Sequence, residues 1–211
     1  DLITNKYFNH EFGLTYVDDF LTTDALTSLR DYLLEGTIWF DQKKGGYLGA
    51  YLGEGLASPL ILQIAKEIKE RFPSLIKDHS LSHIWAYKYD SRSRIPGSDI
   101  SGIQIHADFA AVNVNFWGTQ TESNLDPDSG GLVVYNKEAP IDWDFTEYNR
   151  NTSRIQAELK KNESGKTVIP YRGNRMVIFN SNLFHETDKY NFKDGYENRR
   201  INITMLFGKR E

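Results

Sequence analysis

Cysteine is absent from the 211-residue sequence. This absence excludes disulfide scaffolds, zinc–thiolate sites, iron–sulfur clusters and thiol catalysis. Any bound metal must therefore be held by His, Asp or Glu, and only five histidines are available.

Long apolar runs and an excess of basic residues are also missing. No run reaches the length of a membrane span and no signal-peptide core begins the chain, so we expect a cytoplasmic protein without a membrane partner. The net charge of −4 offers no basic footprint for nucleic acid. The chain begins at Asp1 without a methionine, so we expect it to be part of a longer protein.

The composition that remains suits one folded domain. Hydrophobic residues make up 39% of the chain and aromatic residues 13%, which is enough for a substantial core. No repeat or linker divides the sequence, so we predict a single domain, 1–211. Within it we expect a support region of helices and short strands at 1–80 and a strand-rich core at 81–211.

Local signals predict the elements of the first region. Apolar alternation predicts a strand at 14–17. A helix capped by Thr22 or Thr23 should end at Gly36, and a second helix should run over 58–72, with a serine cap followed by proline. Between these two helices, the glycines of 45–55 predict turns or a mobile flap.

The second region carries many short strands separated by Gly, Pro, Asn and Asp, which is typical of a sandwich or barrel with helices outside. One helix is predicted at 152–161. The predicted strands are Ile84–Tyr89, Gly102–His106, Ala111–Trp117, Leu132–Tyr135, Thr167–Tyr171, Arg175–Asn180 and Arg200–Phe207.

Polar residues alternate with apolar ones along 102–108, 111–117 and 200–207. The residues on the polar side are Gln104, His106, Asp108, Asn113, Asn115, Trp117, Arg200, Asn202 and Thr204. A sheet with one face in water would explain any one of these strands. A polar pocket inside a barrel, with the apolar outer face covered by helices, explains all three together.

A metal site is the sharpest hypothesis for this pocket. In an extended segment His106 and Asp108 point to the same side, and imidazole plus carboxylate suits Fe(II). His185 follows the buried-type strand 175–179 after a short turn and completes a facial triad, although a surface histidine is the alternative. His10, His79 and His83 have no partners at useful spacing and are interpreted as ordinary.

A buried arginine adds a second half to the site. Arg200 lies on the polar side of the last predicted strand, and a buried guanidinium needs an anion. A dicarboxylate could chelate the metal at one end and bind Arg200 at the other. Alternation favours Arg200 for this role, but a β-bulge would exchange it with Arg199.

These motifs resemble those of the 2-oxoglutarate/Fe(II)-dependent dioxygenase superfamily, whose fold is a double-stranded β-helix, a cupin-like jelly roll. The resemblance covers about 84–208 and rests on His-x-Asp, a distant His and Arg-x-Asn. The segments Tyr87–Tyr89, Gly130–Leu132 and Pro170–Phe179 support it. The last strand is similar to that of AlkB-type demethylases, and prolyl hydroxylases share these motifs. The whole chain resembles bacterial oxygenase domains that follow tetratricopeptide repeats, which implies fusion to a repeat domain.

The resemblance implies roles for individual residues. Fe(II) would be bound by His106, Asp108 and His185, with 2-oxoglutarate and O2 as cosubstrates. The far carboxylate of 2-oxoglutarate would be held by Arg200, with Tyr87 or Tyr89 as a hydrogen-bond donor. Asn115 and Asn202 are further candidates for cosubstrate binding, and Asn202 stands where many relatives have Ser.

The implied reaction is hydroxylation of a protein side chain or a small metabolite, with succinate and CO2 as coproducts. The retained carboxylate of Asp108 argues against the halogenating branch of the superfamily. The alternative is a non-catalytic metal- or ligand-binding module on the same fold. A cupin-like isomerase or hydrolase is a third hypothesis, but it would normally require another His or a Glu near His106.

Overall fold

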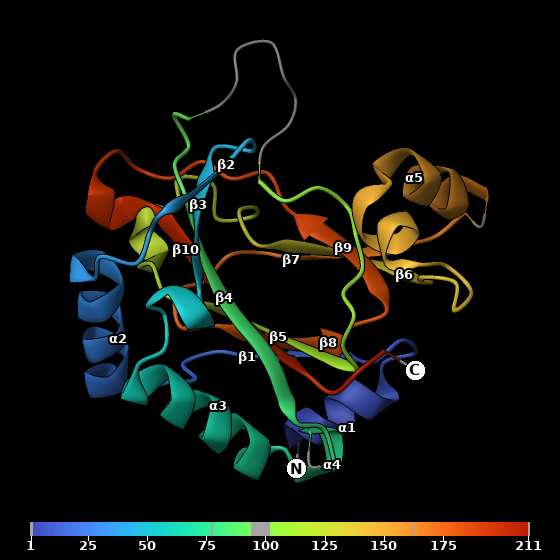
Figure 1. The fold of residues 1–211 in the computed structure, drawn as a ribbon, viewed down its shortest axis with the longest axis horizontal. Helices are drawn as coiled ribbons and strands as arrows, with labels where there is room; N and C mark the ends of the chain where they lie inside the picture. The colour runs from blue at the N-terminus through green and yellow to red at the C-terminus, as the bar shows by residue number, and fades with distance from the viewer. Residues whose placement is uncertain (1, 77, 94–101, 162, 211) are drawn as a thin grey trace.

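Two antiparallel sheets face each other, with helices on the outside, in the computed structural model of this protein (Figure 1). The structure describes residues 2–76, 78–93, 102–161 and 163–210. The larger sheet has seven strands in the order β1-β8-β5-β10-β4-β3-β2, and the smaller has three in the order β7-β6-β9. The predicted class, mainly β with flanking helices, is confirmed.

The strands are β1 (Leu14–Val17), β2 (Asp41–Lys43), β3 (Tyr47–Tyr51), β4 (Leu81–Tyr89), β5 (Val112–Trp117), β6 (Leu132–Glu138), β7 (Lys166–Ile169), β8 (Met176–Asn180), β9 (Leu183–Thr187) and β10 (Arg200–Phe207). The α-helices are α1 (Leu2–Asn9), α2 (Thr23–Glu35), α3 (Pro59–Arg71), α4 (Pro73–Ile76) and α5 (Thr152–Lys161). Short turns of other helix types are η1 (Leu52–Glu54), η2 (Thr121–Ser123), η3 (Thr146–Arg150) and η4 (Tyr196–Asn198). None of the helices described is long and apolar enough to cross a membrane.

Helices α2 and α3 cover the outer face of the larger sheet (Figure 1). Each begins at a predicted cap, because Thr22 Oγ1 accepts a hydrogen bond from Ala25 N at 3.3 Å and Ser58 Oγ accepts one from Ile61 N at 3.2 Å. The apolar residues of β5 and β10 point outward and form one buried cluster with the apolar stripes of these helices. Full burial of one such side chain contributes about 1.5–3 kcal/mol, so this outer layer is the main hydrophobic core.

The inner face of β5 and β10 is polar, as the alternation predicts. Asn113, Asn115, Arg200, Asn202 and Thr204 are between 0 and 5% exposed. The alternative of a face open to water is therefore wrong. These polar residues lie between the two sheets, within a barrel-like interior.

An insertion between β6 and β7 covers the smaller sheet. It contains η3 and α5, and its residues Trp143 and Ile155 pack with Ile105 and Phe184 in a separate cluster. In Figure 1 this insertion stands across the interior from the β2–β3 hairpin. Residues of both segments line one cavity.

The predicted strand Gly102–His106 is wrong. Only His106 forms a bridge, with His185. Residues 102–105 form no strand, although Ile103 O accepts a hydrogen bond from Thr187 N at 3.1 Å. Gly102 has a φ of +71°. Ile103 and Ile105 belong to two different hydrophobic clusters, so they do not share one sheet face.

The glycine-rich segment also differs from its prediction. It forms strands β2 and β3, which pair with each other and with β4, and turns occur only between and after them. Gly46 closes the hairpin with a φ of +76°, where a Cβ would lie 2.3 Å from Ser93 O. Strands β1, β2 and β3 thus join the sheet of the predicted core, and the division into two regions stays a prediction.

Lys88 is a buried cation on the outer side of β4. It is 1% exposed, and its Nζ donates to Leu33 O at 2.9 Å and to Tyr196 Oη at 2.6 Å. The ring of Trp39 lies 4.4 Å from the same nitrogen. Burial lowers the pKa of Lys88 from 10.5 to about 7, and the nearby charge of Arg199 adds to this effect.

We expect Lys88 to make the stability depend on pH. Because its pKa is lower in the folded than in the unfolded state, the unfolded chain binds more protons between these two values, and stability must rise with pH there. The group should add about 2 kcal/mol to the free energy of unfolding between about pH 7 and about pH 9. Urea unfolding of the wild type and of Lys88→Met at the two pH values measures this difference.

The exposed Lys66→Met variant serves as the matched control, because its charge is never desolvated. It should keep the wild-type dependence on pH. An unchanged dependence in Lys88→Met would contradict the assignment.

Candidate metal centre

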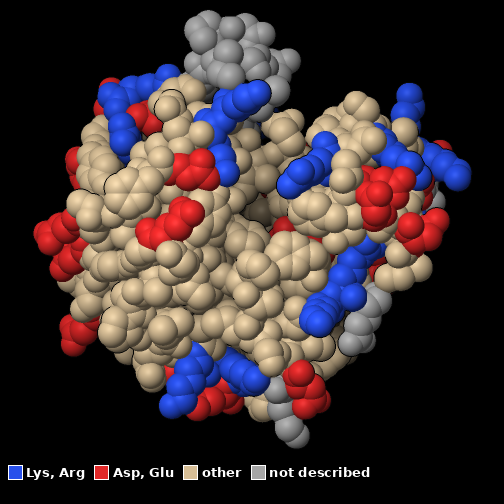
Figure 2. All heavy atoms as spheres, in the orientation of Figure 1, with Lys and Arg blue, Asp and Glu red and all other residues tan. Residues whose placement is uncertain are grey.

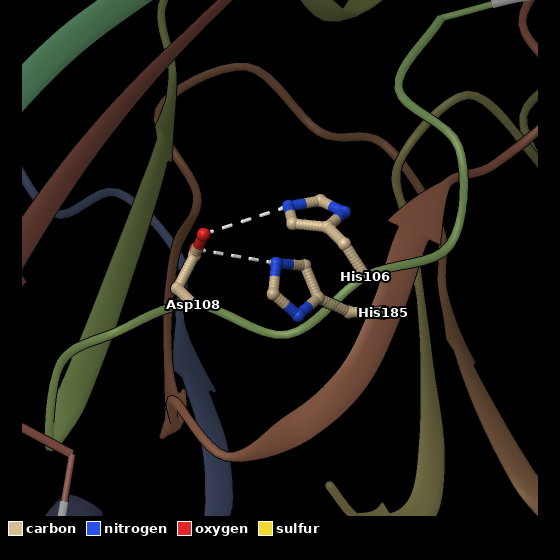
Figure 3. Close-up of side chains that lie close together, drawn as sticks. All are labelled: His106, Asp108 and His185. Carbon is tan, nitrogen blue, oxygen red and sulfur yellow. Dashed lines mark ion pairs between the residues drawn. The ribbon is translucent and has the colours of Figure 1, made fainter. Parts of the chain in front are cut away.

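Three side chains from two parts of the chain meet inside the barrel. One nitrogen or oxygen atom from each of His106, Asp108 and His185 lies within 4.8 Å of the others. The Nε2 atoms of His106 and His185 lie 3.6 and 3.5 Å from the carboxylate oxygens of Asp108 (Figure 3). The structure thus brings together the three residues predicted as ligands.

Backbone pairing places the two histidines side by side. His106 N donates to His185 O at 3.0 Å, and His185 N donates to His106 O at 2.8 Å. His185 lies on β9, a strand that was not predicted, and is 4% exposed. The alternative of a surface histidine is therefore wrong.

Each imidazole is also oriented through its second nitrogen. His106 Nδ1 lies 2.7 Å from Gln104 O, and His185 Nδ1 lies 2.9 Å from Leu183 O. A carbonyl can only accept, so Nδ1 carries the proton and donates it in both rings. Both Nε2 atoms face Asp108 and are the nitrogens that could bind a metal ion.

The charges of the three groups suit a cation. Burial lowers the pKa of His106 to about 4, and repulsion from His185 adds to this shift, so the ring is neutral at ordinary pH. Burial would raise the pKa of Asp108, but hydrogen bonds and charges from His185, His106 and Asn113 outweigh it and lower the pKa. Two imidazoles and one carboxylate are thus the donors at hand.

A chain of hydrogen bonds runs from Asp108 along the polar face. Asn113 Nδ2 donates to Asp108 Oδ2 at 2.7 Å, and Asn115 Nδ2 donates to Asn113 Oδ1 at 2.6 Å. Thr204 Oγ1 donates to Asn115 Oδ1 at 3.3 Å, and Asn202 Nδ2 donates to Thr204 Oγ1 at 3.0 Å. An ionised carboxylate only accepts, so it sets the direction of every bond in this chain.

The chain of hydrogen bonds ends on an acceptor. Asn202 Oδ1 is buried and has no hydrogen-bond partner among the described residues. Asn115 has both ends of its amide engaged and Asn202 only one. Both asparagines predicted for cosubstrate binding line the cavity, but only Asn202 has an acceptor oxygen without a partner among the described residues.

Arg200 lies at the other end of the same face and is 1% exposed. Its Nε donates to Gly130 O at 2.6 Å and its Nη2 to Gly131 O at 3.0 Å. Its Nη1 is buried and has no partner in the described part of the chain. A buried, unpaired guanidinium N–H is costly, and a carboxylate on a ligand would satisfy it.

Tyr89 and Tyr87 surround the arginine differently. The guanidinium of Arg200 lies 4.7 Å from the Tyr89 ring centroid, and Tyr89 Oη lies 3.5 Å from Thr187 Oγ1. Tyr87 lies further along β4, with its ring 5.0 Å from that of Tyr47. Burial raises the pKa of both tyrosines, so both hydroxyls remain protonated donors.

Arg199 points away from this site. Its Nη2 lies 2.8 Å from Asp90 Oδ2, in a pair on the opposite side of the sheet from Arg200. Strand β10 keeps a regular register with β4 from Arg200 onward, and its irregularity lies between Leu206 and Phe207. No bulge exchanges the two arginines.

All of these inward groups line one cavity of about 870 Å³. Figure 2 shows the molecule hollowed at this place, with basic side chains on both sides of the opening. His83, interpreted as ordinary from the sequence, lies on the cavity wall with its ring 4.7 Å from Phe109. Asn113 belonged to the predicted polar face, but no sequence signal showed that it contacts Asp108.

The chemistry of the donors fits a metal and a carboxylate ligand. Two imidazole nitrogens and one carboxylate, with open positions, form the set that non-haem Fe(II) uses. The unpaired Nη1 of Arg200 supplies the anion-binding group within the same cavity. The two features fit a metal-chelating acid with a second carboxylate.

Comparison with known proteins shows the fold. No protein-family model matches the chain, and no curated protein matches it in sequence. Solved structures are similar over almost its whole length. The non-haem alpha-ketoglutarate-dependent epimerase SnoN from nogalamycin biosynthesis is 12% identical with a TM-score of 0.66, and the match covers 99% of this chain and 82% of that one.

Two further structures are similar. A Pseudomonas putida prolyl-4-hydroxylase is 14% identical, with a TM-score of 0.59 and coverage of 99% of this chain and 98% of that one. HygX from Streptomyces hygroscopicus, with nickel, 2-oxoglutarate and hygromycin B bound, is 13% identical with a TM-score of 0.61, covering 97% and 85%. The predicted double-stranded β-helix fold is confirmed by these likenesses.

Loss of the hydrogen bond from Asn113 should weaken metal binding. Asn113→Ala leaves Asp108 Oδ2 without the donor that orients it, and loss of such an outer partner typically costs about 10–100-fold in affinity. Titration of the metal-free protein with Mn(II), followed by electron paramagnetic resonance, measures the dissociation constant.

Ser181→Ala is the control, because the Ser181 hydroxyl is buried near Asp108 but has no partner among the described residues. It should bind Mn(II) as the wild type does. Equal affinity of Asn113→Ala and wild type, with both folded by circular dichroism, would show that Asn113 does not position the carboxylate.

Proposed function

We propose that this protein is an Fe(II)- and 2-oxoglutarate-dependent dioxygenase that hydroxylates a protein side chain or a small metabolite. One observation carries the proposal: a His–Asp–His set and a buried arginine, with an N–H that has no partner among the described residues, line the same cavity. The metal set alone would suit several enzyme classes. The arginine adds the site that a dicarboxylate cosubstrate requires.

His106, Asp108 and His185 would hold Fe(II), and three protein ligands would leave coordination positions for other ligands. Bound there, the metal supplies the activation of O2, with one oxygen atom entering the substrate and the other entering succinate as 2-oxoglutarate loses CO2. The protein keeps His106 neutral and Asp108 ionised, which are the forms that bind a metal.

Arg200 would bind the far carboxylate of 2-oxoglutarate through Nη1. Its other contacts, to Gly130 O and Gly131 O, hold the guanidinium in place before the ligand arrives. Tyr89 covers one face of the guanidinium, and its protonated hydroxyl is a further donor, as is that of Tyr87. Because these contacts already order Arg200 in the folded protein, ligand binding loses less conformational entropy.

Asn115 and Asn202 line the same cavity as the metal ligands and Arg200 and would support binding there. Asn115 would act on the Asp108 carboxylate through Asn113, because both ends of the Asn115 amide are engaged in the chain of hydrogen bonds. Asn202 presents an acceptor oxygen beside Arg200. This oxygen suits a water molecule or a donor group of the substrate better than a carboxylate.

The domain extent, the location in the cell and the fusion to a repeat domain stay predictions from the sequence. A single domain over 1–211, a cytoplasmic location and fusion to a repeat domain are predictions that the fold leaves open. An acceptor of protein or small-molecule type is consistent with the similar structures, which include a prolyl-4-hydroxylase and a protein with hygromycin B bound.

Fe(II) and 2-oxoglutarate should bind together. Added without oxygen, they should give a weak visible charge-transfer band in the wild type and none in His106→Ala, because two ligands hold the metal poorly. His79→Ala is the control, since His79 lies outside the cavity. If the band is absent from metal-replete wild type, the proposal fails. If the band forms but oxygen yields no succinate, the non-catalytic module is supported instead.

Arg200 and Arg199 should differ in their effect on the cosubstrate. Arg200→Gln removes a charged hydrogen bond, so half-saturation of the charge-transfer band should need about 10–100-fold more 2-oxoglutarate. Arg199→Gln changes the same charge on the opposite side of the sheet and should leave the titration unchanged. Equal shifts in the two variants would contradict the role of Arg200.

A further inference from the structure

We propose that the outer part of the cavity recognises a small molecule that carries a ring and a negatively charged group. That this molecule is the substrate rests on the proposed function. Of the two substrate classes, protein side chains and small metabolites, the inference favours small metabolites. It rests on the charge, the aromatic surface and the size of the cavity.

Two cations face the cavity from opposite walls. Lys44 lies in the turn of the β2–β3 hairpin, and Arg150 is the last residue of η3 in the insertion across the opening. Neither pairs with a carboxylate in the part of the chain that the structure describes. Figure 2 shows basic side chains on both sides of the hollow, in a protein whose net charge is −4.

Most other charges of the cavity have a partner of opposite sign. Lys43 Nζ lies 2.5 Å from Asp41 Oδ2. Glu186 accepts a hydrogen bond from Tyr135 Oη at 2.6 Å, but the hydroxyl is neutral and does not balance the charge of the carboxylate. The carboxylates of Asp108 and of bound 2-oxoglutarate would balance Fe(II) and Arg200. The two positive charges of Lys44 and Arg150 exceed the one negative charge of Glu186, so the lining keeps a net positive charge and a further ligand should be an anion.

Aromatic side chains form the wall beside Arg150. The ring of Phe109 lies 4.7 Å from that of His83 and 6.1 Å from that of Phe145. Phe145 is 37% exposed at the cavity, and the Arg150 guanidinium lies 5.2 Å from its ring centroid. Exposed aromatic surface that lines a cavity favours a ligand with a flat apolar face.

The opposite wall adds further rings from β3 and β4. Tyr51, Trp85 and Tyr87 line the cavity there, and the rings of Trp85 and Tyr87 are 6.3 Å apart. A planar body between the two walls would reach Lys44 and Arg150 at the opening with its charged group. The volume of about 870 Å³ must also hold the cosubstrate. This cavity volume lies within the range of about 300–1,000 Å³ that is typical of small-molecule sites, which favours a metabolite over a protein as the substrate.

Three matched probes test the inference: 2-naphthylacetate, its neutral amide and 2-naphthylethylamine, which share one ring system and differ in charge. Binding is measured by ligand-observed NMR on protein with Mn(II) and 2-oxoglutarate present, so that the Arg200 site is filled and no turnover occurs. The acid should bind about tenfold more tightly than the amide, because charged hydrogen bonds add this much, and the amine should bind most weakly.

Variants assign the preference to residues. The double variant Lys44→Gln/Arg150→Gln should bind the acid no better than the amide. Lys160→Gln/Lys161→Gln removes the same charge from α5, outside the cavity, and should keep the preference. Phe145→Leu should weaken all three probes about equally, because it removes ring contact and no charge.

Several results would overturn the inference. The first is binding of the acid that is equal to or weaker than that of the amide. The second is no binding of any probe, and the third is a preference for the acid that survives in the double variant. Tighter binding of an aspartate-rich peptide than of the naphthyl acid would overturn the assignment to small molecules.

The proposed function fails separately. A lost preference with an intact charge-transfer band refutes only this inference. A retained preference without a band refutes only the oxygenase, and the cavity then remains a site for organic anions.

Discussion

Polar groups taken out of water must find partners inside a protein, and the inner face of β5 and β10 follows from this requirement. Asp108 can only accept, so Asn113 must donate to it, and the same logic continues through the chain of hydrogen bonds to Asn202. Three buried polar atoms of this face have no hydrogen-bond partner among the described residues: Trp117 Nε1, Asn202 Oδ1 and Arg200 Nη1. Asn202 and Arg200 line the cavity, where a ligand could pair with their free atoms.

The polar interior depends on the apolar outer face of the same strands. With polar groups between the two sheets, much of the hydrophobic stabilisation comes from the layer that packs against α2 and α3. Strand β10 serves both layers, because alternate residues enter the outer core and the cavity. A rigid outer core thus positions the site, and a loop-based site would be less exact in its geometry.

The metal ligands come from different parts of the scaffold. Asp108 is held to β5 of the larger sheet through Asn113, whereas His185 belongs to β9 of the smaller one. His106 joins them through its backbone bridge to His185. A metal ion bound by all three would link the two sheets, so binding should stabilise the fold as well as support chemistry.

Sequence periodicity determined what depends on neighbours along the chain. It located the helices at 23–35, 59–71 and 152–161, the strand at 200–207 and the inward direction of the polar residues, and the residue types identified His106, Asp108 and His185 as candidate ligands. Local alternation and capping encode these features directly.

Only the tertiary structure decided which distant segments meet. It placed His106 and Asp108 in an irregular segment, gave His185 a strand of its own and directed Arg200 rather than Arg199 inward. It also set Lys44 and Arg150 across one opening. Register, pairing and facing walls depend on contacts between residues far apart in the chain, and no local pattern records them.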